Sequence, residues 1–222
     1  MNVLLTQDGI EYGPLDCTTL EGAIQCISDV FVKNEPMTQA LGITISEFQH
    51  FARAAYPPLA EAGLSFVARD GKTGQVIGCR ISEDLYQPEE PPPIPDLCPK
   101  FFPLFAALEE LGRHFFEIRE VTPRKYIHLF MIAVREEYGG RGVAPTMNRI
   151  FFKHVKDLGF THAVTEPTGA ISQHILVNKF GFKVLRKLSY QDFHFEGEPI
   201  FKDIQGHDGI MLLEKDLSEI QV

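Results

Sequence analysis

The chain has 222 residues and a mass of 25.0 kDa, a length that one hydrophobic core can serve. Hydrophobic residues make up 44% of it and charged residues 23%, close to the globular average, so extensive disorder is not expected. The net charge of −9 argues against a protein that binds nucleic acid through phosphate contacts, and favours a cationic partner.

Helical periodicity dominates the first part of the chain. Apolar residues at helical spacing predict a helix over residues 19–33, and Thr18 and Glu21 have the spacing of a capping box at its start. A second helix is predicted from Ser46 to about Ala55, because the pair of prolines that follows normally ends a helix.

The rest of the chain alternates strands and helices. Six prolines between residues 86 and 99 predict a loop with neither helix nor strand. The other predicted elements are, in chain order, strands at 64–69 and 75–82, a helix at about 104–118, a strand at 126–134, a helix at about 145–158, a strand at 161–165, a helix at 172–180, and strands at 184–193 and 209–214. This mixture predicts one α/β or α+β domain over residues 1–222, with an antiparallel first half and a strand–helix–strand–helix core.

Targeting and metal-binding signals are not evident. The N-terminal residues have no basic stretch before a long apolar run, and no apolar run reaches the roughly 20 residues of a membrane helix, so we expect a cytoplasmic protein that does not contact membranes. The four cysteines are scattered, which predicts buried thiols and no metal site: Cys17, Cys26, Cys79 and Cys98.

The segment of residues 134–152 (VREEYGGRGVAPTMNRIFF) carries the clearest chemical signal. A predicted buried strand runs into Gly139-Gly140-Arg141-Gly142-Val143-Ala144, and a helix follows. Glycines allow close approach of a ligand to the backbone, and the unpaired N–H groups at the start of a helix favour an anion such as a pyrophosphate. The segment matches neither the Walker A pattern nor the GxGxxG pattern.

This segment resembles the acyl-CoA loop of the GNAT superfamily of N-acetyltransferases, which reads Gln/Arg-x-x-Gly-x-Gly/Ala. The match departs from the family at Gly139, where Gln or Arg is usual, and Arg141 is the residue that could compensate. A helix that ends in Gly-Phe before a strand, over residues 172–185, and a preceding hairpin, over 64–82, complete the resemblance. It implies a GNAT fold, in which helices flank a mixed, mostly antiparallel sheet that is splayed between its fourth and fifth strands.

The sequence is more closely similar to the arylalkylamine N-acetyltransferases of insect type. These enzymes carry a Glu-Pro pair after the first helix, matched here by Glu35-Pro36, and a long connection with an extra helix, matched at about 83–120. The resemblance implies that Glu35 is the general base, acting through ordered water. The alternative is that Glu35 only caps or solvates a loop.

The resemblance also implies that acetyl-CoA is the co-substrate. It assigns cofactor binding to the backbone of Met131, Ile132, Ala133 and Val134 and to residues 139–144. Many GNAT enzymes carry a tyrosine acid where this chain has Val177. Ser172, His174 and His128 are the candidates for proton transfer, although a helix N-cap, a surface histidine and a core histidine are the respective alternatives.

The expected acceptor is a small primary amine, in particular an arylalkylamine. Tyr12, Met37 and Tyr190 are the candidate substrate-binding residues, since the chain is rich in aromatic residues, with 18 Phe. A polyamine, an aminoglycoside, a protein N-terminus, or an impaired acyl-CoA-binding protein are the alternatives. The sequence does not decide between a monomer and a homodimer.

The charge is unevenly distributed along the chain. Residues 1–63 contain eight acidic and two basic residues, whereas residues 124–156 contain seven basic and two acidic ones. This distribution predicts an acidic site for a cationic amine and a basic site for an anionic co-substrate.

Overall fold

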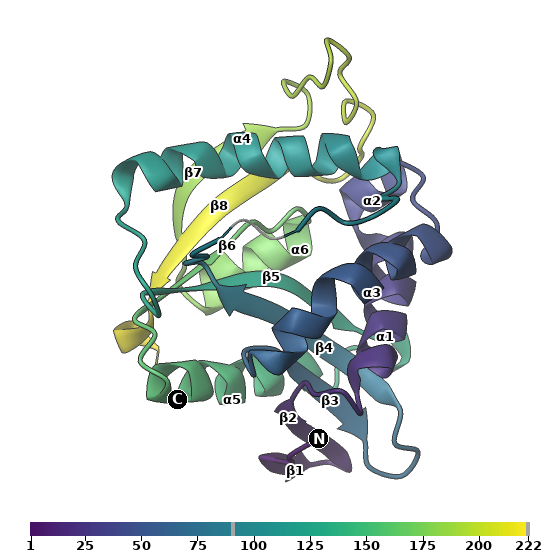
Figure 1. The fold of residues 1–222 in the computed structure, drawn as a ribbon, viewed down its shortest axis with the longest axis vertical. Helices are drawn as coiled ribbons and strands as arrows, with labels where there is room; N and C mark the ends of the chain where they lie inside the picture. The colour runs from purple at the N-terminus through teal and green to yellow at the C-terminus, as the bar shows by residue number, and fades with distance from the viewer. Residues whose placement is uncertain (90–91, 221–222) are drawn as a thin grey trace.

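The computed structural model describes residues 1–89 and 92–220 and contains an eight-stranded sheet with the order β1-β2-β3-β4-β5-β6-β8-β7 (Figure 1). The strands are β1 (Leu5–Gln7), β2 (Ile10–Pro14), β3 (Phe66–Asp70), β4 (Val76–Asp84), β5 (Tyr126–Val134), β6 (His162–Thr165), β7 (Lys183–Ser189) and β8 (Gly209–Asp216). Neighbouring strands are antiparallel except β5 and β6, which are parallel. The sheet is therefore mixed and mostly antiparallel, as the sequence predicted.

Helices cover both faces of the sheet. They are α1 (Leu20–Asn34), α2 (Pro36–Ala40), α3 (Ile45–Glu61), α4 (Phe102–Ile118), α5 (Val143–Asp157) and α6 (Ala170–His174), which continues as a π-helical turn over Ile175–Lys179. Short 3₁₀ turns lie at Pro99–Phe101, Glu136–Tyr138 and Leu217–Glu219.

The two faces bury different apolar clusters because side chains alternate along each strand. On one face, α1 and α3 pack against Val67 and Ile81, and α4 packs against Tyr126 and Leu212. On the other face, α5 packs against Phe66 and Ile127 together with Leu176 of the π-helical turn that follows α6 (Figure 1). We refer to these as the α1/α4 face and the α5 face.

The ladder between β5 and β6 is short, and the strands part after it. Only Tyr126, Ile127 and His128 of β5 pair with β6, whose strand ends at Thr165 while β5 continues to Val134. The Thr165 hydroxyl donates to the Leu129 carbonyl, at 2.8 Å, just beyond this ladder. The predicted splay of the sheet is therefore present.

A β-bulge lies on β5 at the point where the strands part. Ile81 of β4 pairs with Met131 and Ser82 pairs with Leu129, so Phe130 is the extra residue on β5. Because a bulge re-aims nearby side chains and backbone groups, it is common beside functional sites.

One predicted helix cap and one predicted helix end are wrong, although the helix predicted at 19–33 is present as α1. The capping box lies at Thr44 and Glu47 of α3, whereas the Thr18 hydroxyl donates to Asp16 and does not cap α1. Helix α3 also continues through both prolines to Glu61. The carbonyls that lose N–H partners there, those of Arg53 and Ala54, lie on its exposed side, where water can replace the missing bonds.

Other predictions differ in extent. The hairpin of β1 and β2 was missed, although its turn, Asp8-Gly9, has positive φ at both residues and is a sequence signal for a hairpin. The helix predicted at 172–180 begins at Ala170, and β7 ends at Ser189 because the chain turns there. Residues 90 and 91 of the predicted 86–99 loop lie outside the described residues. The rest of that loop forms no helix or strand as far as Cys98, and Pro99 begins a 3₁₀ turn.

The cysteines do not all follow the expectation of burial. Cys26 and Cys79 are buried, whereas Cys98 is half-buried and Cys17 is exposed. None of the helices in the described part of the chain combines the length and the apolar character that crossing a bilayer requires.

Candidate active site

A cavity of about 960 Å³ opens where β5 and β6 part, and residues from both faces of the sheet line it. Phe31 and Glu35 line it on the α1/α4 face, and Ala144 and Asn148 of α5 line it on the opposite face. Residues 128–134 of β5 lie between them. The cavity therefore joins the two faces through the gap in the sheet.

The lining on the α1/α4 face combines aromatic rings with carboxylates. Phe51 packs edge-to-face or stacked against several of its neighbours, with ring centroids 5.1 to 6.5 Å apart. The aromatic residues of the lining are Phe31, Phe48, Phe51, Phe101, Phe105, Phe116 and Phe130. Its acidic residues are Glu35, Glu109, Glu117 and Glu166. This side of the cavity therefore suits a ligand with an apolar body and a positive charge.

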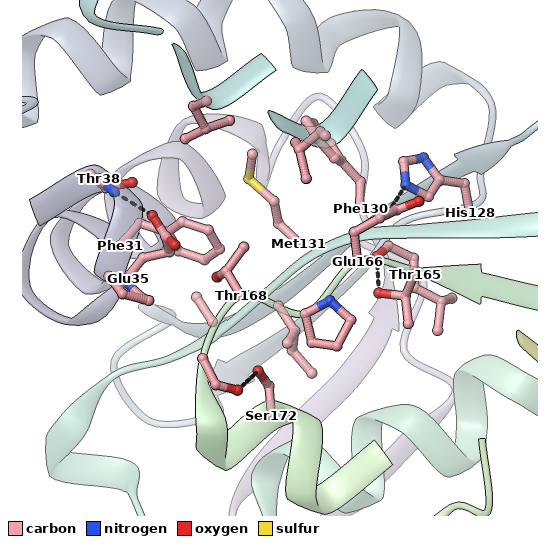
Figure 2. Close-up of a pocket in the computed structure, with 18 of the residues that line it drawn as sticks. Phe31, Glu35, Thr38, His128, Phe130, Met131, Thr165, Glu166, Thr168 and Ser172 are labelled. Atoms are coloured by element: carbon pink, nitrogen blue, oxygen red, sulfur yellow. Dashed lines mark hydrogen bonds and ion pairs between the residues drawn. The ribbon is translucent and has the colours of Figure 1, made fainter. Parts of the chain in front are cut away.

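Glu35 lies at the junction of α1 and α2, where Pro36 begins the second helix. Its carboxylate accepts the backbone N–H groups of Met37, at 3.0 Å, and Thr38, at 2.6 Å, and so caps α2. The predicted alternative, a capping role, is thus observed, and the same carboxylate lines the cavity (Figure 2). The two hydrogen bonds fix its position relative to the cavity.

Thr38 adds a polar group beside Glu35. Its side chain is fully buried and lines the cavity, and its hydroxyl has no hydrogen-bond partner among the residues that the structure describes. A buried polar group without a partner costs about 1–3 kcal/mol, so a ligand atom that bonded this hydroxyl would relieve that cost.

His128 lies across the cavity from Glu35, beside Glu166 (Figure 2), and is held by two carboxylates. Its Nδ1 is 2.8 Å from Glu83 and its Nε2 is 2.8 Å from Glu166. Burial alone would lower the pKa of His128, but the carboxylates of Glu166 and Glu83 outweigh it and raise the pKa to about 10. His128 is therefore a cation at neutral pH, which argues against a role as a proton acceptor there.

The glycine loop has the backbone geometry of an anion site. Gly140 and Gly142 have φ of 71° and 75°, a region that favours glycine, and a Cβ at either would meet open space. Within the described chain, the backbone N–H groups of Gly140, Arg141 and Gly142 make no hydrogen bond. These groups and the start of α5, which Gly142 caps, fit a pyrophosphate such as that of CoA.

The structure gives a physical reason for glycine at position 139. The Gly139 N–H donates to the Glu136 carbonyl at 2.8 Å, which closes a 3₁₀ turn. A Cβ at this position would lie 2.9 Å from that oxygen, so Gln or Arg would require the turn to shift. Arg141 lies with its Cζ 4.9 Å from the centre of the Tyr138 ring, on the exposed loop.

The other predicted cofactor contacts divide into two groups. Residues 131–134 of β5 and Ala144 line the cavity, whereas residues 139–142 lie on the loop beyond it and Val143 begins α5. The Val143 side chain is buried in the core beneath α5 and can contribute only its backbone.

Of the two candidates for proton transfer on α6, Ser172 lines the cavity and His174 does not. Ser172 lines the cavity, and its hydroxyl donates to the Gly169 carbonyl at 2.8 Å (Figure 2). Gly169, and not Ser172, is the N-cap of α6. His174 lies outside the cavity, exposed and hydrogen-bonded to Asn178, which corresponds to the surface histidine alternative.

None of the three predicted substrate-binding residues lines the cavity. Tyr12 is buried in the core on the α5 face, and Met37 is buried behind α2. Tyr190 lies behind Thr168 and donates its hydroxyl to the Thr168 carbonyl at 2.8 Å. Burial, together with the charge of Glu35, raises the pKa of Tyr190 well above its ordinary value, so it is a neutral phenol.

Several functional candidates were missed because they come from distant segments. Glu83 and Glu166 reach His128 from positions 45 and 38 residues away. Arg80 of β4 and Asn148 of α5 also line the cavity. No local motif marks these residues, although the charged pair Arg80 and Glu83 within a buried strand was a usable signal. His207, in the loop before β8, lines the cavity and accepts the Ala170 N–H at 3.0 Å.

No family model matches the sequence. Among solved structures, the C-terminal condensation domain of Ebony, in complex with beta-alanyl-dopamine, is similar with a TM-score of 0.83 and 21% identity over 93% of this chain and 98% of that one. Arylalkylamine N-acetyltransferase 2 from Aedes aegypti gives a TM-score of 0.78 and 20% identity, over 95% of this chain and 100% of that one.

A third similar structure is the Drosophila melanogaster polyamine N-acetyltransferase, an enzyme that catalyses the formation of N-acetylagmatine. It gives a TM-score of 0.68 and 16% identity, over 93% of this chain and 99% of that one. At these identities the similarity establishes the fold. The chain has the GNAT fold, as the resemblance to insect arylalkylamine N-acetyltransferases predicted.

Proposed function

We propose that this protein is an N-acetyltransferase that transfers an acetyl group from acetyl-CoA to a small primary amine, in particular an arylalkylamine. The observation that carries the proposal is the cavity through the gap between β5 and β6. It extends from Val134 and Ala144, which flank a glycine loop suited to a pyrophosphate, to an aromatic and acidic pocket on the opposite face. A thioester and an amine that entered from opposite faces would meet at the β5 bulge.

The pocket on the α1/α4 face supports an aromatic amine as acceptor. Its phenylalanine rings provide an apolar surface for an aryl group, and Glu35 and Glu166 provide negative charge for an ammonium group. The Thr38 hydroxyl, buried beside Glu35, is available to the same nitrogen. The names of the similar structures, which include an arylalkylamine N-acetyltransferase, are consistent with this choice.

Glu35 is the residue we assign as general base. An ammonium group must lose a proton before its nitrogen can attack a carbonyl carbon, and a fixed carboxylate beside the pocket can accept that proton directly or through water. Glu166 also lines the cavity, but its carboxylate is engaged by the cationic His128. A backbone N–H of the bulged part of β5 would stabilise the charge on the thioester oxygen.

A polyamine is the second candidate acceptor. The carboxylates of Glu35 and Glu109 both line the cavity, so a second ammonium group could be bound at a distance from the first. The apolar character of the pocket favours the aryl group. An aminoglycoside would leave several hydroxyl groups against phenylalanine rings, at a cost in desolvation.

The test is a thiol-release assay with acetyl-CoA and a panel of arylalkylamines, polyamines and aminoglycosides. We expect the highest kcat/KM for arylalkylamines. The Glu35→Gln variant should lower kcat by about 10²-fold or more and alter its pH profile, because the amide cannot accept a proton. Binding of acetyl-CoA should raise the Tm, since a ligand that binds only the native state stabilises it.

Glu47→Gln is the matched control for this variant. Glu47 also accepts a backbone N–H at a helix start, that of Thr44, but it does not line the cavity. We expect turnover by Glu47→Gln to equal that of the wild type. Turnover by Glu35→Gln at the wild-type rate would remove Glu35 from the mechanism, and a Tm that does not change with saturating acetyl-CoA would refute the proposed function.

A further inference from the structure

Arg80 is a buried cation in the wall of the cavity. It lies on β4 with 3% of its surface exposed, on the α5 face of the sheet. Its Nε donates to Oδ1 of Asn148 at 2.8 Å, and its Cζ lies 5.4 Å from the centre of the Phe151 ring. Arg80 and Asn148 both line the cavity, on the side of the glycine loop.

The two side chains present hydrogen-bond donors without acceptors. Within residues 1–89 and 92–220, the Nη groups of Arg80 make no hydrogen bond or ion pair. Because Arg80 can only donate, Asn148 must turn its oxygen toward Arg80, which leaves the amide NH₂ of Asn148 without a recorded partner. These donors lie in the wall of the cavity, where water or an acceptor on a ligand can bond them.

The guanidinium also lacks a counter-charge. Burial lowers the pKa of Arg80 to about 10, so it is still a cation at neutral pH, and the Cys79 thiol is the other group that acts on it. The carboxylates of the cavity, Glu35 and Glu166, come from the α1/α4 face and do not contribute. An uncompensated buried charge is unfavourable, so a ligand group that supplied negative charge here would be bound strongly.

Acyl transfer from a thioester produces negative charge on the donor side of this cavity. Glu35 takes the first proton of the ammonium group and releases it to water. The neutral amine nitrogen then bonds to the carbonyl carbon and loses a second proton to Glu35, the carbon–sulfur bond breaks, and its electron pair passes to sulfur as a thiolate. Val177 stands where many GNAT enzymes have a tyrosine acid, so this chain lacks that means of neutralising the sulfur.

We propose that Arg80, held by Asn148, stabilises the thiolate that leaves when the carbon–sulfur bond breaks. This inference rests on the proposed function and adds a catalytic residue to it. A cation fixed beforehand where charge develops acts on the transition state more than on the ground state, which raises kcat without tighter binding of the thioester. The thiolate takes a proton from water as the product leaves.

The first experiment measures the pKa of the CoA thiol when CoA is bound, and it does not require catalysis. CoA bound to the wild-type protein is titrated by the ultraviolet absorbance of its thiolate, and the binding of CoA is compared with that of desulfo-CoA as the pH is raised. We expect the bound thiol to titrate about one pH unit below free CoA, and CoA to bind up to about tenfold more tightly than desulfo-CoA at high pH. Arg80→Met should abolish both effects, and Arg80→Lys should retain part of them.

The second experiment separates sulfur stabilisation from other roles. Arg80→Met should lower kcat by about 10²–10³-fold with little change in the KM for acetyl-CoA. Arg53→Met removes an exposed arginine, paired with Glu21 and outside the cavity, and should leave all readouts unchanged. Thermal unfolding of each variant verifies that the fold is intact.

Three outcomes would overturn the inference. If CoA binds but its thiol titrates as in free CoA, the proposed function stands and the role of Arg80 fails. If Arg80→Met weakens desulfo-CoA as much as CoA, Arg80 binds another part of the cofactor. If the wild type prefers an acyl-CoA that carries a carboxylate and Arg80→Met loses that preference, the partner of Arg80 is the acyl chain.

Discussion

His128 shows how neighbouring groups decide the chemistry of a single residue. A histidine on a central strand was a candidate proton carrier, yet two carboxylates hold it as a cation. Its charge compensates one of the two acids, so the Glu83–His128–Glu166 group keeps one net negative charge beside the cavity. We interpret His128 as a positioning residue for Glu166.

This interpretation predicts how stability depends on pH. Because the folded pKa of His128, about 10, lies above its ordinary value near 6.5, its contribution should be complete below about pH 6.5 and lost as the pH rises toward 10. We expect the difference in free energy of unfolding between the wild type and His128→Gln to shrink over this range. Urea unfolding across the pH series measures it, and a difference that grew with pH would contradict the assignment.

At the scale of the helices and strands, two segments have the spacing of a capping box, and only one of them caps a helix. Helix α3 begins at a capping box in which the Thr44 hydroxyl accepts the Glu47 N–H and the Glu47 carboxylate accepts the Thr44 N–H. The similar spacing of Thr18 and Glu21 makes no such box, because Thr18 is held by Asp16 and by the N-terminal amine.

Substitution of the two threonines should therefore lower the free energy of unfolding by different amounts. Thr44→Ala should lower the free energy of unfolding by about 1 kcal/mol, the usual value for a lost N-cap. Thr18→Ala removes an exposed hydroxyl that caps no helix and should have a smaller effect. Denaturant unfolding of both variants compares them, and equal losses would show that the box at Thr44 contributes no more than a surface hydrogen bond.

Elements with clear local signals could be predicted from the sequence, and those that depend on distant contacts could not. The bounds of β5 were predicted correctly because nine consecutive, mostly apolar residues are bounded by polar ones. The end of α3 was not, since burial of Tyr56 and Ala60 outweighs the local effect of two prolines. Glu35 was predicted as a site residue from the resemblance of its local Glu-Pro pair, and it lines the cavity, whereas Arg80 and Asn148 meet only in the folded chain, across 68 residues of sequence.

At the scale of the whole molecule, the net charge of −9 does not describe the cavity, whose two sides differ in charge. The side near Glu35 carries four carboxylates against two cations, Arg113 and His128, whereas the side near α5 carries Arg80 and adjoins the glycine loop. Several cations of residues 124–156 are already paired, among them Arg135 with Asp29 and Lys153 with Asp157. The long-range attraction of an anionic ligand therefore depends on few charges.

Arg141 is the cation whose removal should reveal this dependence. It is exposed on the glycine loop, and no ion pair is recorded for it in the described chain. We expect Arg141→Ala to weaken acetyl-CoA binding severalfold at low salt and to reduce the dependence of binding on salt, because exposed charges are screened. Calorimetric titration at several salt concentrations measures this, with Lys153→Ala as the control on α5; equal salt dependence in both variants would exclude Arg141 from the site.

The short ladder between β5 and β6 is also the place where the sheet has few strand-to-strand contacts. Three residue pairs join β5 to β6, compared with seven between β4 and β5 and four between β6 and β8, so the ladder at this seam is shorter than the ladders beside it. Segments with few buried bonds open locally at low free energy. A ligand bound in the gap would contact β5 and the segment that follows β6, so its binding should slow amide hydrogen exchange along this seam.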